Sequence, residues 1–271
     1  MRVGVVGAGG KMGREVCRTV GGDPELELVA AVDPQLAGID LRQLTGEDAG
    51  GLSIERDLGA LVDAGVEVVV DFTRADAARD TLAWCAEAGI HAVVGTTGFN
   101  DEDITTLERL FAGPERGAPN CIVAANFAIG AVLMMRFAAM AAPWFEGAEI
   151  VELHHDGKLD APSGTSMRTA ERMAAARVAA GVDEFAGDRT TTVMVEGARG
   201  GAGPGGIRMH SVRLTGLIAH QEVMFGAVGQ GLTIRHDSYD RTSFMAGVAL
   251  AIRAVTTRPG LTLGLDPLLG F

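Results

Sequence analysis

The amino-acid sequence predicts an α/β fold, in which a doubly wound parallel sheet precedes an α+β domain with a mostly antiparallel open sheet. Three observations lead to this prediction. Apolar runs alternate with helical patterns over about the first 127 residues, a glycine-rich turn follows the first run, and the later strands have no helices between them. We therefore expect two domains, one formed by residues 1–128 and 239–271 and the other by residues 129–238.

The predicted strands of the first domain are short and rich in small or β-branched apolar residues. The run at 66–73 is apolar on both faces, as expected of a central parallel strand. The helix expected at 101–111 carries acidic residues in its first turn, where they complement the helix dipole. In chain order we expect a strand at 2–6, a helix at 12–20, strands at 28–33 and 66–73, a helix at 75–88, a strand at 91–98, a helix at 101–111 and a strand at 120–127.

The pattern changes after residue 128. We expect a helix at 129–142, a strand at 148–155 and a helix at 164–180, followed by four strands without intervening helices, which predicts antiparallel pairing. These four strands are expected at 190–196, 207–214, 219–225 and 232–237, with a flexible glycine-rich loop at 197–206 and a last helix at 241–255.

The composition excludes several classes of protein. The 271 residues include 23 Lys and Arg against 35 Asp and Glu, so the net charge of −12 provides no basic footprint for nucleic acid. There is no signal-peptide layout and no apolar run of membrane-spanning length, so we expect a cytoplasmic protein. No metal-ligand spacing occurs. Cys17, Cys85 and Cys121 lie in apolar surroundings and are expected to be buried thiols.

The turn Gly7–Gly13, GAGGKMG, follows the first predicted strand and opens the first helix. Glycines there let the backbone approach a pyrophosphate at a helix N-terminus, and Asp33, at the end of the next strand, is placed to accept hydrogen bonds from a ribose. This pattern predicts a Rossmann-like domain that binds a dinucleotide. The carboxylate of Asp33 repels a 2′-phosphate and Pro34 rather than an arginine follows it, so NADH is favoured over NADPH, although Lys11 and Arg14 leave NADPH open.

Three further strand ends carry polar residues or glycines. Because ligands of open α/β sheets bind at the carboxyl ends of the strands, these segments are expected to form the nicotinamide site. The segments are Asp71-Phe72-Thr73, Gly95-Thr96-Thr97-Gly98 and Ala125-Asn126-Phe127.

The stretch ELHHDGKLDAPSGTS, residues 152–166, combines proton carriers with an anion-binding turn. His154 and His155 end a strand, so alternation sends them to opposite faces and predicts different roles. Lys158 adds positive charge for an acidic substrate. Ser163 is a good N-cap, after which Gly164 and Thr165 present backbone N–H groups suited to a carboxylate. His210, His220 and His236 are expected to be packed or interfacial.

These motifs resemble the 4-hydroxy-tetrahydrodipicolinate reductase (dihydrodipicolinate reductase) family of lysine and diaminopimelate biosynthesis. The resemblance runs through GAGGKMG, DFT, GTTGF, AANFAIG and ELHHxxKxDAPSGTS to IAHQEVMFG and LTIRHDSYDRTSF, nearly the whole chain. It implies reduction of (2S,4S)-4-hydroxy-2,3,4,5-tetrahydrodipicolinate to (S)-2,3,4,5-tetrahydrodipicolinate with loss of water. A nicotinamide would deliver hydride to ring C4.

The resemblance also implies roles for residues. His154 would be the proton donor or acceptor and Lys158 a proton donor, while His155, Ser163, Gly164 and Thr165 would bind a small cyclic dicarboxylate. A homotetramer would form through the open sheet of the second domain. The cofactor, NADH or NADPH, would be bound by Gly7, Ala8, Gly9, Gly10, Lys11, Met12, Asp33, Phe72, Thr73, Gly95, Thr96, Thr97, Ala124, Ala125, Asn126 and Phe127.

The stretch departs from the family at one point. The family commonly has a third histidine two residues after the pair, whereas Asp156 and Gly157 stand in the two middle places here. We expect activity to survive because His154 and Lys158 are present. The acidic side chain of Asp156 is expected to affect how tightly a substrate dianion binds. Two alternatives stay open: another two-domain amino-acid-pathway dehydrogenase of the aspartate or homoserine type, and a non-catalytic NAD(H)-sensing protein.

Overall fold

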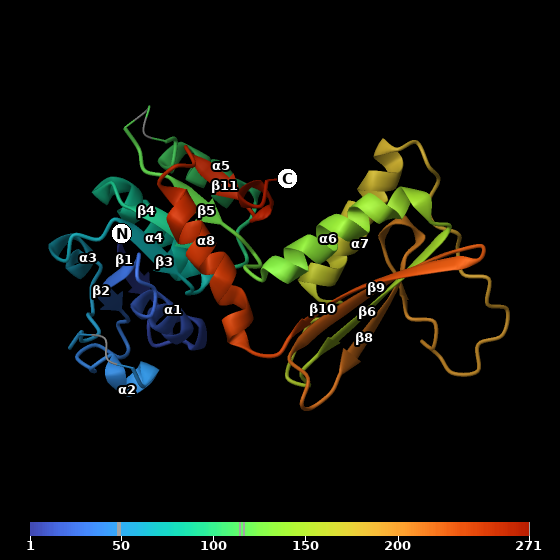
Figure 1. The fold of residues 1–271 in the computed structure, drawn as a ribbon, viewed down its shortest axis with the longest axis horizontal. Coiled ribbons are helices and arrows are strands. Elements are labelled where there is room, and N and C mark those ends of the chain that lie inside the picture. The colour runs from blue at the N-terminus through green and yellow to red at the C-terminus, as the bar shows by residue number, and fades with distance from the viewer. Residues whose placement is uncertain (48–49, 114, 116, 271) are drawn as a thin grey trace. The chain divides into compact units, whose positions relative to one another are not determined.

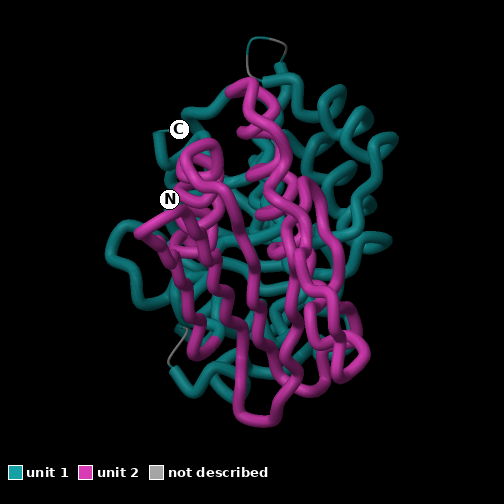
Figure 2. Tube along the Cα trace, turned by 90° about the vertical axis from the view of Figure 1, so that its right-hand side faces the viewer, with its two compact units in different colours: residues 1–127, 241–271 teal, residues 128–240 magenta. Residues whose placement is uncertain are grey.

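The structure, a computed structural model, describes residues 1–47, 50–113, 115 and 117–270. The chain divides into two compact units, coloured separately in Figure 2: residues 1–127 with 241–271, and residues 128–240. These bounds lie one or two residues from the predicted domain bounds. The roles predicted for the two parts remain predictions.

The first unit is a parallel sheet with helices packed around it, in the strand order β11-β5-β4-β3-β1-β2 (Figure 1). The chain order reverses between β1 and β3, which is where doubly wound sheets place their ligand crevice. The strands are β1 (Arg2–Val6), β2 (Glu27–Val32), β3 (Val68–Asp71), β4 (His91–Val94), β5 (Cys121–Val123) and β11 (Leu261–Leu263).

The helices of the first unit agree with the predicted pattern except for short elements that the sequence did not signal. The unpredicted elements are α2 (Arg42–Thr45), α3 (Gly59–Asp63), the terminal 3-10 turn η5 (Asp266–Leu268) and the edge strand β11. The helices are α1 (Lys11–Gly21), α2 (Arg42–Thr45), α3 (Gly59–Asp63), α4 (Ala75–Ala88), α5 (Asp101–Leu110) and α8 (Met245–Val255), the last preceded by the 3-10 turn η4 (Arg241–Phe244).

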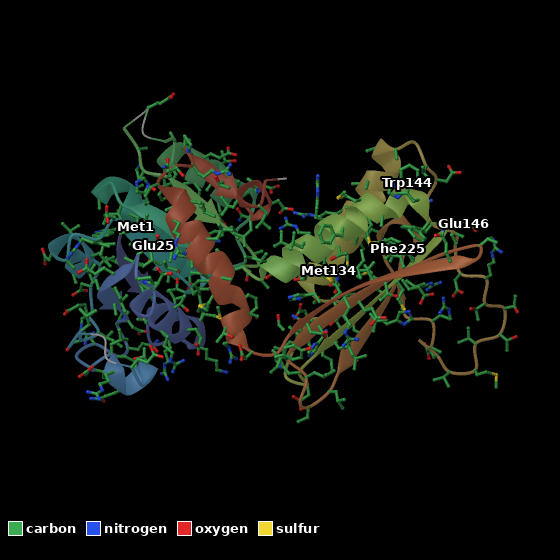
Figure 3. All side chains as sticks on the ribbon, viewed as in Figure 1. Met1, Glu25, Met134, Trp144, Glu146 and Phe225 are labelled. Atoms are coloured by element: carbon green, nitrogen blue, oxygen red, sulfur yellow. The ribbon has the colours of Figure 1, made fainter. Side chains whose placement is uncertain are left out.

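The core of the first unit lies between the sheet and its helices. Val69, Leu82, Cys85 and Phe111 are fully buried there. All three cysteines are free and buried, as predicted, and burial raises the pKa of Cys17 and Cys85 to about 12. In Figure 3, Met1 and Glu25 lie side by side, and the terminal amino group donates a hydrogen bond to the carbonyl oxygen of Glu25 at 3.1 Å.

The second unit is a mixed sheet in the order β10-β9-β6-β8-β7, with α6 and α7 against one face (Figure 1). Along β9 the buried residues Gln221, Val223 and Phe225 alternate with more exposed ones, as expected of a sheet covered on one side. The elements are α6 (Ile129–Ala141), the 3-10 turn η2 (Ala142–Trp144), β6 (Gly147–His154), α7 (Gly164–Ala179), β7 (Gly201–Ala202), the 3-10 turn η3 (Pro204–Gly206), β8 (Arg208–Arg213), β9 (Ala219–Ala227) and β10 (Gln230–Ser238).

The residues labelled in the second unit in Figure 3 illustrate this layering. Met134 on α6 and Phe225 on β9 are both buried, whereas Trp144 is 80% exposed. The ring of Phe145, which follows Trp144, lies 5.3 Å from that of Phe225, centroid to centroid. The apolar interior of this unit is therefore the layer between the two helices and the sheet.

Two predictions for the second domain were wrong. Residues 190–196 form no strand: Met194 is 88% exposed, and this β-prone run pairs with no strand of the two sheets in the part of the chain that the structure describes. β8 pairs with β6 in parallel, not antiparallel, because α7 connects the two strands as a crossover helix. The loop predicted at 197–206 contains β7 and a 3-10 turn at Pro204–Gly206.

Candidate active site

The glycine turn at the end of β1 is shaped by close backbone contacts. Gly7 has a φ of +74°, and its N–H donates to the carbonyl oxygen of Val32 at 2.9 Å. A Cβ on Gly13 would lie 2.1 Å from the oxygen of Gly7, so helix α1 starts directly against the turn only because residue 13 is a glycine. The result is a helix N-terminus next to a turn with few side chains.

Asp33 fixes the same turn from the end of β2. Its Oδ2 accepts the N–H of Gly9 at 3.0 Å and its Oδ1 accepts that of Gln35 at 3.0 Å. Each carboxylate oxygen has a second lone pair, so both can still accept a hydroxyl hydrogen. A Cβ on Gly9 would lie 2.7 Å from Asp33 Oδ2 and therefore fill the space beside this carboxylate. The turn thus fits a dinucleotide whose pyrophosphate meets α1 and whose ribose meets Asp33.

A buried carboxyl group joins the ends of β3 and β4. Asp71 Oδ1 accepts hydrogen bonds from the N–H of Thr73 at 2.7 Å and from its hydroxyl at 2.6 Å, and the hydroxyl of Thr96 lies 3.3 Å away. Burial raises the pKa of Asp71, although these hydrogen bonds act in the opposite direction. The two turns after β3 and β4 are therefore held by one side chain.

Aromatic packing adds the end of β5 to this group. The ring of Phe72 lies 5.5 Å from that of Phe127, and a Cβ on Gly95 would lie 1.9 Å from the Phe72 ring. The structure thus gathers the predicted cofactor residues along one edge of the parallel sheet, at the carboxyl ends of five adjacent strands. These residues are Gly7, Ala8, Gly9, Gly10, Lys11 and Met12 after β1, Asp33 after β2, Phe72 and Thr73 after β3, Gly95, Thr96 and Thr97 after β4, and Ala124, Ala125, Asn126 and Phe127 after β5.

In the second unit, His154 is the last residue of β6 and is paired with a buried carboxylate. Its Nδ1 lies 2.5 Å from Oε2 of Glu152, whose side chain is 1% exposed. Burial opposes ionisation of Glu152, but hydrogen bonds from His154, Arg213 and Ser211 outweigh it and lower the pKa of Glu152 to about 2. Glu152 is consequently an anion at neutral pH.

The loop that follows β6 carries the other predicted polar residues. Lys158 Nζ donates to Asp160 Oδ1 at 2.7 Å, and this contact lowers the pKa of Asp160. Asp156 Oδ2 accepts the hydroxyl hydrogen of Thr215 at 2.6 Å, and this hydrogen bond lowers the pKa of Asp156. His155 is exposed, in contrast to the partly buried His154.

Helix α7 begins at Gly164 with a cap, as predicted. Ser163 is 3% exposed, and its hydroxyl accepts the N–H of Ser166 at 3.2 Å. The Ser166 hydroxyl donates to Oε1 of Gln221 on β9 at 2.7 Å, and the Gln221 amide donates to Thr169 at 2.8 Å. This buried polar chain anchors the first turn of α7 to the sheet.

The predicted site residues thus form two sets, one in each unit. Within the second unit, His154, Lys158, Ser163, Gly164 and Thr165 all lie between the end of β6 and the first turn of α7. The sequence reasoning missed two residues of this set, Glu152 and Arg213. The two-residue alternation of side chains along a strand would have identified Glu152, which lies on the same strand face as His154. Arg213 lies 61 residues from Glu152 in sequence, and only the parallel pairing of β6 with β8 brings the two together.

Other candidate features lie apart from these sets. His210 pairs with Glu149 and His220 with Asp237, each at 2.7 Å, and His236 packs against Gly130. A cavity of about 400 Å³ in the second unit and one of about 490 Å³ in the first are lined by none of the predicted site residues. Among the residues described, no cluster of three or more His, Cys, Asp or Glu could hold a metal ion, and no helix is long and apolar enough to span a membrane.

Comparisons with known proteins give consistent results along the chain. Residues 1–127 match the family model "Dihydrodipicolinate reductase, N-terminus" and residues 130–269 match "Dihydrodipicolinate reductase, C-terminus". Curated proteins named 4-hydroxy-tetrahydrodipicolinate reductase are similar over the full length. The relative from Cutibacterium acnes is 49% identical over 100% of this chain and 99% of its own, and that from Nocardia farcinica is 50% identical over 99% and 98%.

Solved structures agree with these matches. A dipicolinate-bound dihydrodipicolinate reductase from Paenisporosarcina sp. TG-14 superposes with a TM-score of 0.84 at 41% identity, covering 98% of both chains. An amine dehydrogenase from Mycobacterium smegmatis has a TM-score of 0.63 at 17% identity, covering 97% of this chain and 94% of its own, and shares the fold alone. The glycine turn, the strand-end residues and the His154–Lys158 stretch therefore stand in a chain that belongs to the dihydrodipicolinate reductase family.

Proposed function

We propose that this chain reduces (2S,4S)-4-hydroxy-2,3,4,5-tetrahydrodipicolinate to (S)-2,3,4,5-tetrahydrodipicolinate, with release of water and oxidation of NADH or NADPH. The observation that carries the proposal is the position of His154 and Lys158 beside the capped start of α7 in a chain of this family. The name of the Paenisporosarcina protein records dipicolinate, a cyclic dicarboxylate, as its ligand. The substrate proposed here is of the same chemical class.

The substrate carboxylates are proposed to meet two kinds of positive group. The first-turn amides of α7, at Gly164 and Thr165, suit one carboxylate because a helix N-terminus is a site of partial positive charge. Lys158 supplies a full charge, and its side chain is 21% exposed. Its present partner, Asp160, is 60% exposed, so exchanging this surface ion pair for a substrate carboxylate costs little.

His154 and Lys158 are proposed to handle protons and His155 to contact the substrate. An imidazole and an ammonium group can both donate protons, which suits release of a hydroxyl group as water. Ser163 is buried and its hydroxyl is engaged by Ser166, so we propose that it acts by shaping the start of α7 rather than by touching the substrate. When bound, the reduced nicotinamide supplies the hydride for ring C4.

We propose that the cofactor lies along the strand-end edge of the first unit and that NADH is preferred. Asp33 already accepts two backbone N–H groups, which hold its charge where a ribose would bind, and a 2′-phosphate there would be repelled. Arg14, one of the two residues with Lys11 that could offset this charge, donates its Nε to the carbonyl oxygen of Gly9 at 2.9 Å.

The cofactor preference is tested by kcat/KM for NADH and NADPH in the wild type, in Asp33→Ser and in Asp57→Ser. Asp57 is an exposed acid outside the predicted site and controls for the loss of a charge. We expect the wild type to favour NADH and Asp33→Ser to lower the NADH/NADPH ratio at least about tenfold, whereas Asp57→Ser leaves it unchanged. A wild-type preference for NADPH would overturn this part of the proposal.

We propose a homotetramer that assembles through the open sheet of the second unit. The face of β6 that carries Val151 and Leu153 is opposite to the face packed on α6 and α7, and no helix of the described residues in this unit covers it. Light scattering is expected to give four times the chain mass of 28.1 kDa. Val151→Glu should shift that mass towards smaller species, while Glu67→Gln on the first unit should not.

The reaction is tested by following NADH and NADPH absorbance while a synthase supplies substrate, with pyridine-2,6-dicarboxylate as competitor. Consumption of reduced cofactor that depends on the synthase and is inhibited by the competitor supports the proposal. Turnover instead with aspartate semialdehyde or homoserine would favour a different dehydrogenase. Cofactor binding without any turnover would favour a sensing protein.

A further inference from the structure

Glu152 contacts His154 in the predicted active site, although the sequence pattern assigned it no role. It is two residues before His154 on β6, so both side chains point to the face of the sheet covered by α7. Its Oε2 is 2.5 Å from Nδ1 of His154. A carboxylate this close to one ring nitrogen can fix both the orientation and the tautomer of an imidazole.

Arg213, on the neighbouring strand β8, stabilises the negative charge of Glu152. Arg213 pairs with His154 in the parallel register of β6 and β8, and its guanidinium donates to both carboxylate oxygens, from Nη1 to Oε2 at 2.9 Å and from Nη2 to Oε1 at 2.8 Å. With these donors the pKa of Glu152 falls to about 2 despite its burial. An ionised carboxylate can only accept hydrogen bonds, so Nδ1 of His154 must be the protonated nitrogen.

Two further contacts keep this carboxylate from moving. The N–H of Ser163, at the start of α7, donates to Glu152 Oε1 at 3.3 Å. The Nη2 of Arg213 also donates to the carbonyl oxygen of Asp160 at 2.6 Å. Glu152 is therefore held by a strand and a helix cap at once, and its position is determined before any substrate binds.

We propose that Glu152 is the positioning residue for His154: it holds the imidazole in the Nδ1–H form and presents Nε2 as the nitrogen that exchanges a proton with the substrate. The inference rests on the proposed function, in which His154 is the proton carrier. Glu152 acts only through His154 and touches no reacting atom. The charged group in contact with the ring is Glu152, which is paired in turn with Arg213 on β8; Lys158 and Asp160 pair with each other in the loop that follows β6.

The first test measures the wild-type protein and does not depend on turnover. Long-range ¹H–¹⁵N spectra of histidine-labelled protein report which ring nitrogen carries the proton, and the His154 signals are assigned by their loss in His154→Gln. In the neutral imidazole of His154, we expect Nδ1 to be protonated and Nε2 to carry no hydrogen. An Nε2–H form of His154 would overturn the proposal, whatever the substrate proves to be.

The second test separates positioning from a structural role. In Glu152→Gln the side chain keeps its size but can offer His154 either a donor or an acceptor, so the tautomer is no longer fixed. We expect kcat to fall about 10- to 100-fold, the usual effect of removing the partner that orients a functional imidazole, with KM for the substrate and Kd for NADH within about threefold of wild type. Glu152→Asp, which keeps the charge, should recover part of kcat.

Glu149→Gln is the matched control. Glu149 lies on the same strand and also pairs with a histidine, His210, and an arginine, Arg199, but on the other face of the sheet. We expect its kcat to stay within about twofold of wild type once light scattering confirms an unchanged mass. A folded Glu152→Gln variant whose kcat is near wild type would contradict the proposal. So would a variant whose loss of kcat/KM comes entirely from a higher KM. Failure of the wild-type enzyme to turn over substrate would instead contradict the proposed function.

Discussion

Gly13 at the start of α1 faces the carbonyl oxygen of Gly7 so closely that a Cβ on Gly13 would lie 2.1 Å from that oxygen. The neighbouring atoms are also backbone, with the Cα of Ala8 at 2.8 Å from the same position. Backbone cannot move aside as a flexible side chain can. The glycine is therefore required by the close approach of helix and turn, and its own helical conformation does not demand it.

Gly13→Ala should weaken both stability and cofactor binding. Accommodating the methyl group must push α1 away from the turn, which we expect to cost about 1–3 kcal/mol of unfolding free energy and at least about tenfold in NADH affinity. Urea unfolding and fluorescence titration with NADH measure the two effects. Gly21→Ala at the other end of α1 is the control, since a Cβ there meets nothing within 4 Å, and it should be neutral or slightly stabilising.

Asp71 should matter to cofactor binding through one of its two oxygens. The bonds from Thr73 and the contact with Thr96 all converge on Oδ1. Asp71→Asn can keep a carbonyl oxygen in that place, so we expect NADH affinity within about threefold of wild type, whereas Asp71→Ala should lose at least about tenfold because the donors are left without an acceptor. Equal affinities in both variants, measured by calorimetry, would show that Asp71 does not order these turns.

The parallel sheet and its glycine turn could be predicted because their signals are local. A buried apolar strand, a glycine turn and an amphipathic helix each lie within about a dozen residues, and the sequence repeats the pattern along the first unit. β11 was missed because three residues, Leu261–Leu263, carry no period of their own and become a strand only by pairing with β5. The strand predicted at 190–196 does not form for the opposite reason: its residues have a local β pattern but pair with no strand of the described residues.

The same distinction separates the predicted from the unpredicted parts of the site. His154, Lys158 and the Ser163 cap stand in one stretch of sequence, so their proximity could be inferred. Arg213 reaches Glu152 only because α7 returns the chain in parallel beside β6, and no local pattern encodes that register. The polar bond from Ser166 to Gln221 likewise spans 55 residues and depends on the pairing of β6 with β9.

The ionisation of Glu152 predicts how acid affects stability. Its pKa is about 2 in the folded chain, below the ordinary 4.5, so the native state holds the charged form more favourably than the unfolded state does. The resulting stability is fully present above about pH 4.5 and is lost as the pH falls towards 2. The difference of about 2.5 pH units sets an upper limit of about 3 kcal/mol.

The variant Glu152→Gln lacks this contribution to stability. Comparing its unfolding free energy with that of wild type therefore separates the effect of Glu152 from that of the other carboxylates. We expect the difference in unfolding free energy between wild type and variant to be largest near pH 7 and to shrink steadily between pH 4.5 and 2.5. Urea titrations at several pH values measure it. A difference that stays constant with pH would mean that folding does not lower the pKa of Glu152.

Arg177 near the end of α7 should be among the costliest single losses in the second unit. It is 5% exposed and donates to the backbone oxygens of Ala142 and Phe145 at 2.7 and 2.8 Å, while its guanidinium carbon lies 4.1 Å from the ring centroid of Phe185. Arg177→Met keeps the apolar stem but leaves buried carbonyl groups without donors, so we expect a loss of about 3 kcal/mol. Arg168→Met, an exposed change on the same helix, should stay within about 0.5 kcal/mol of wild type in the same urea unfolding experiment. If both variants unfold at the wild-type midpoint, the turn after α6 does not depend on Arg177.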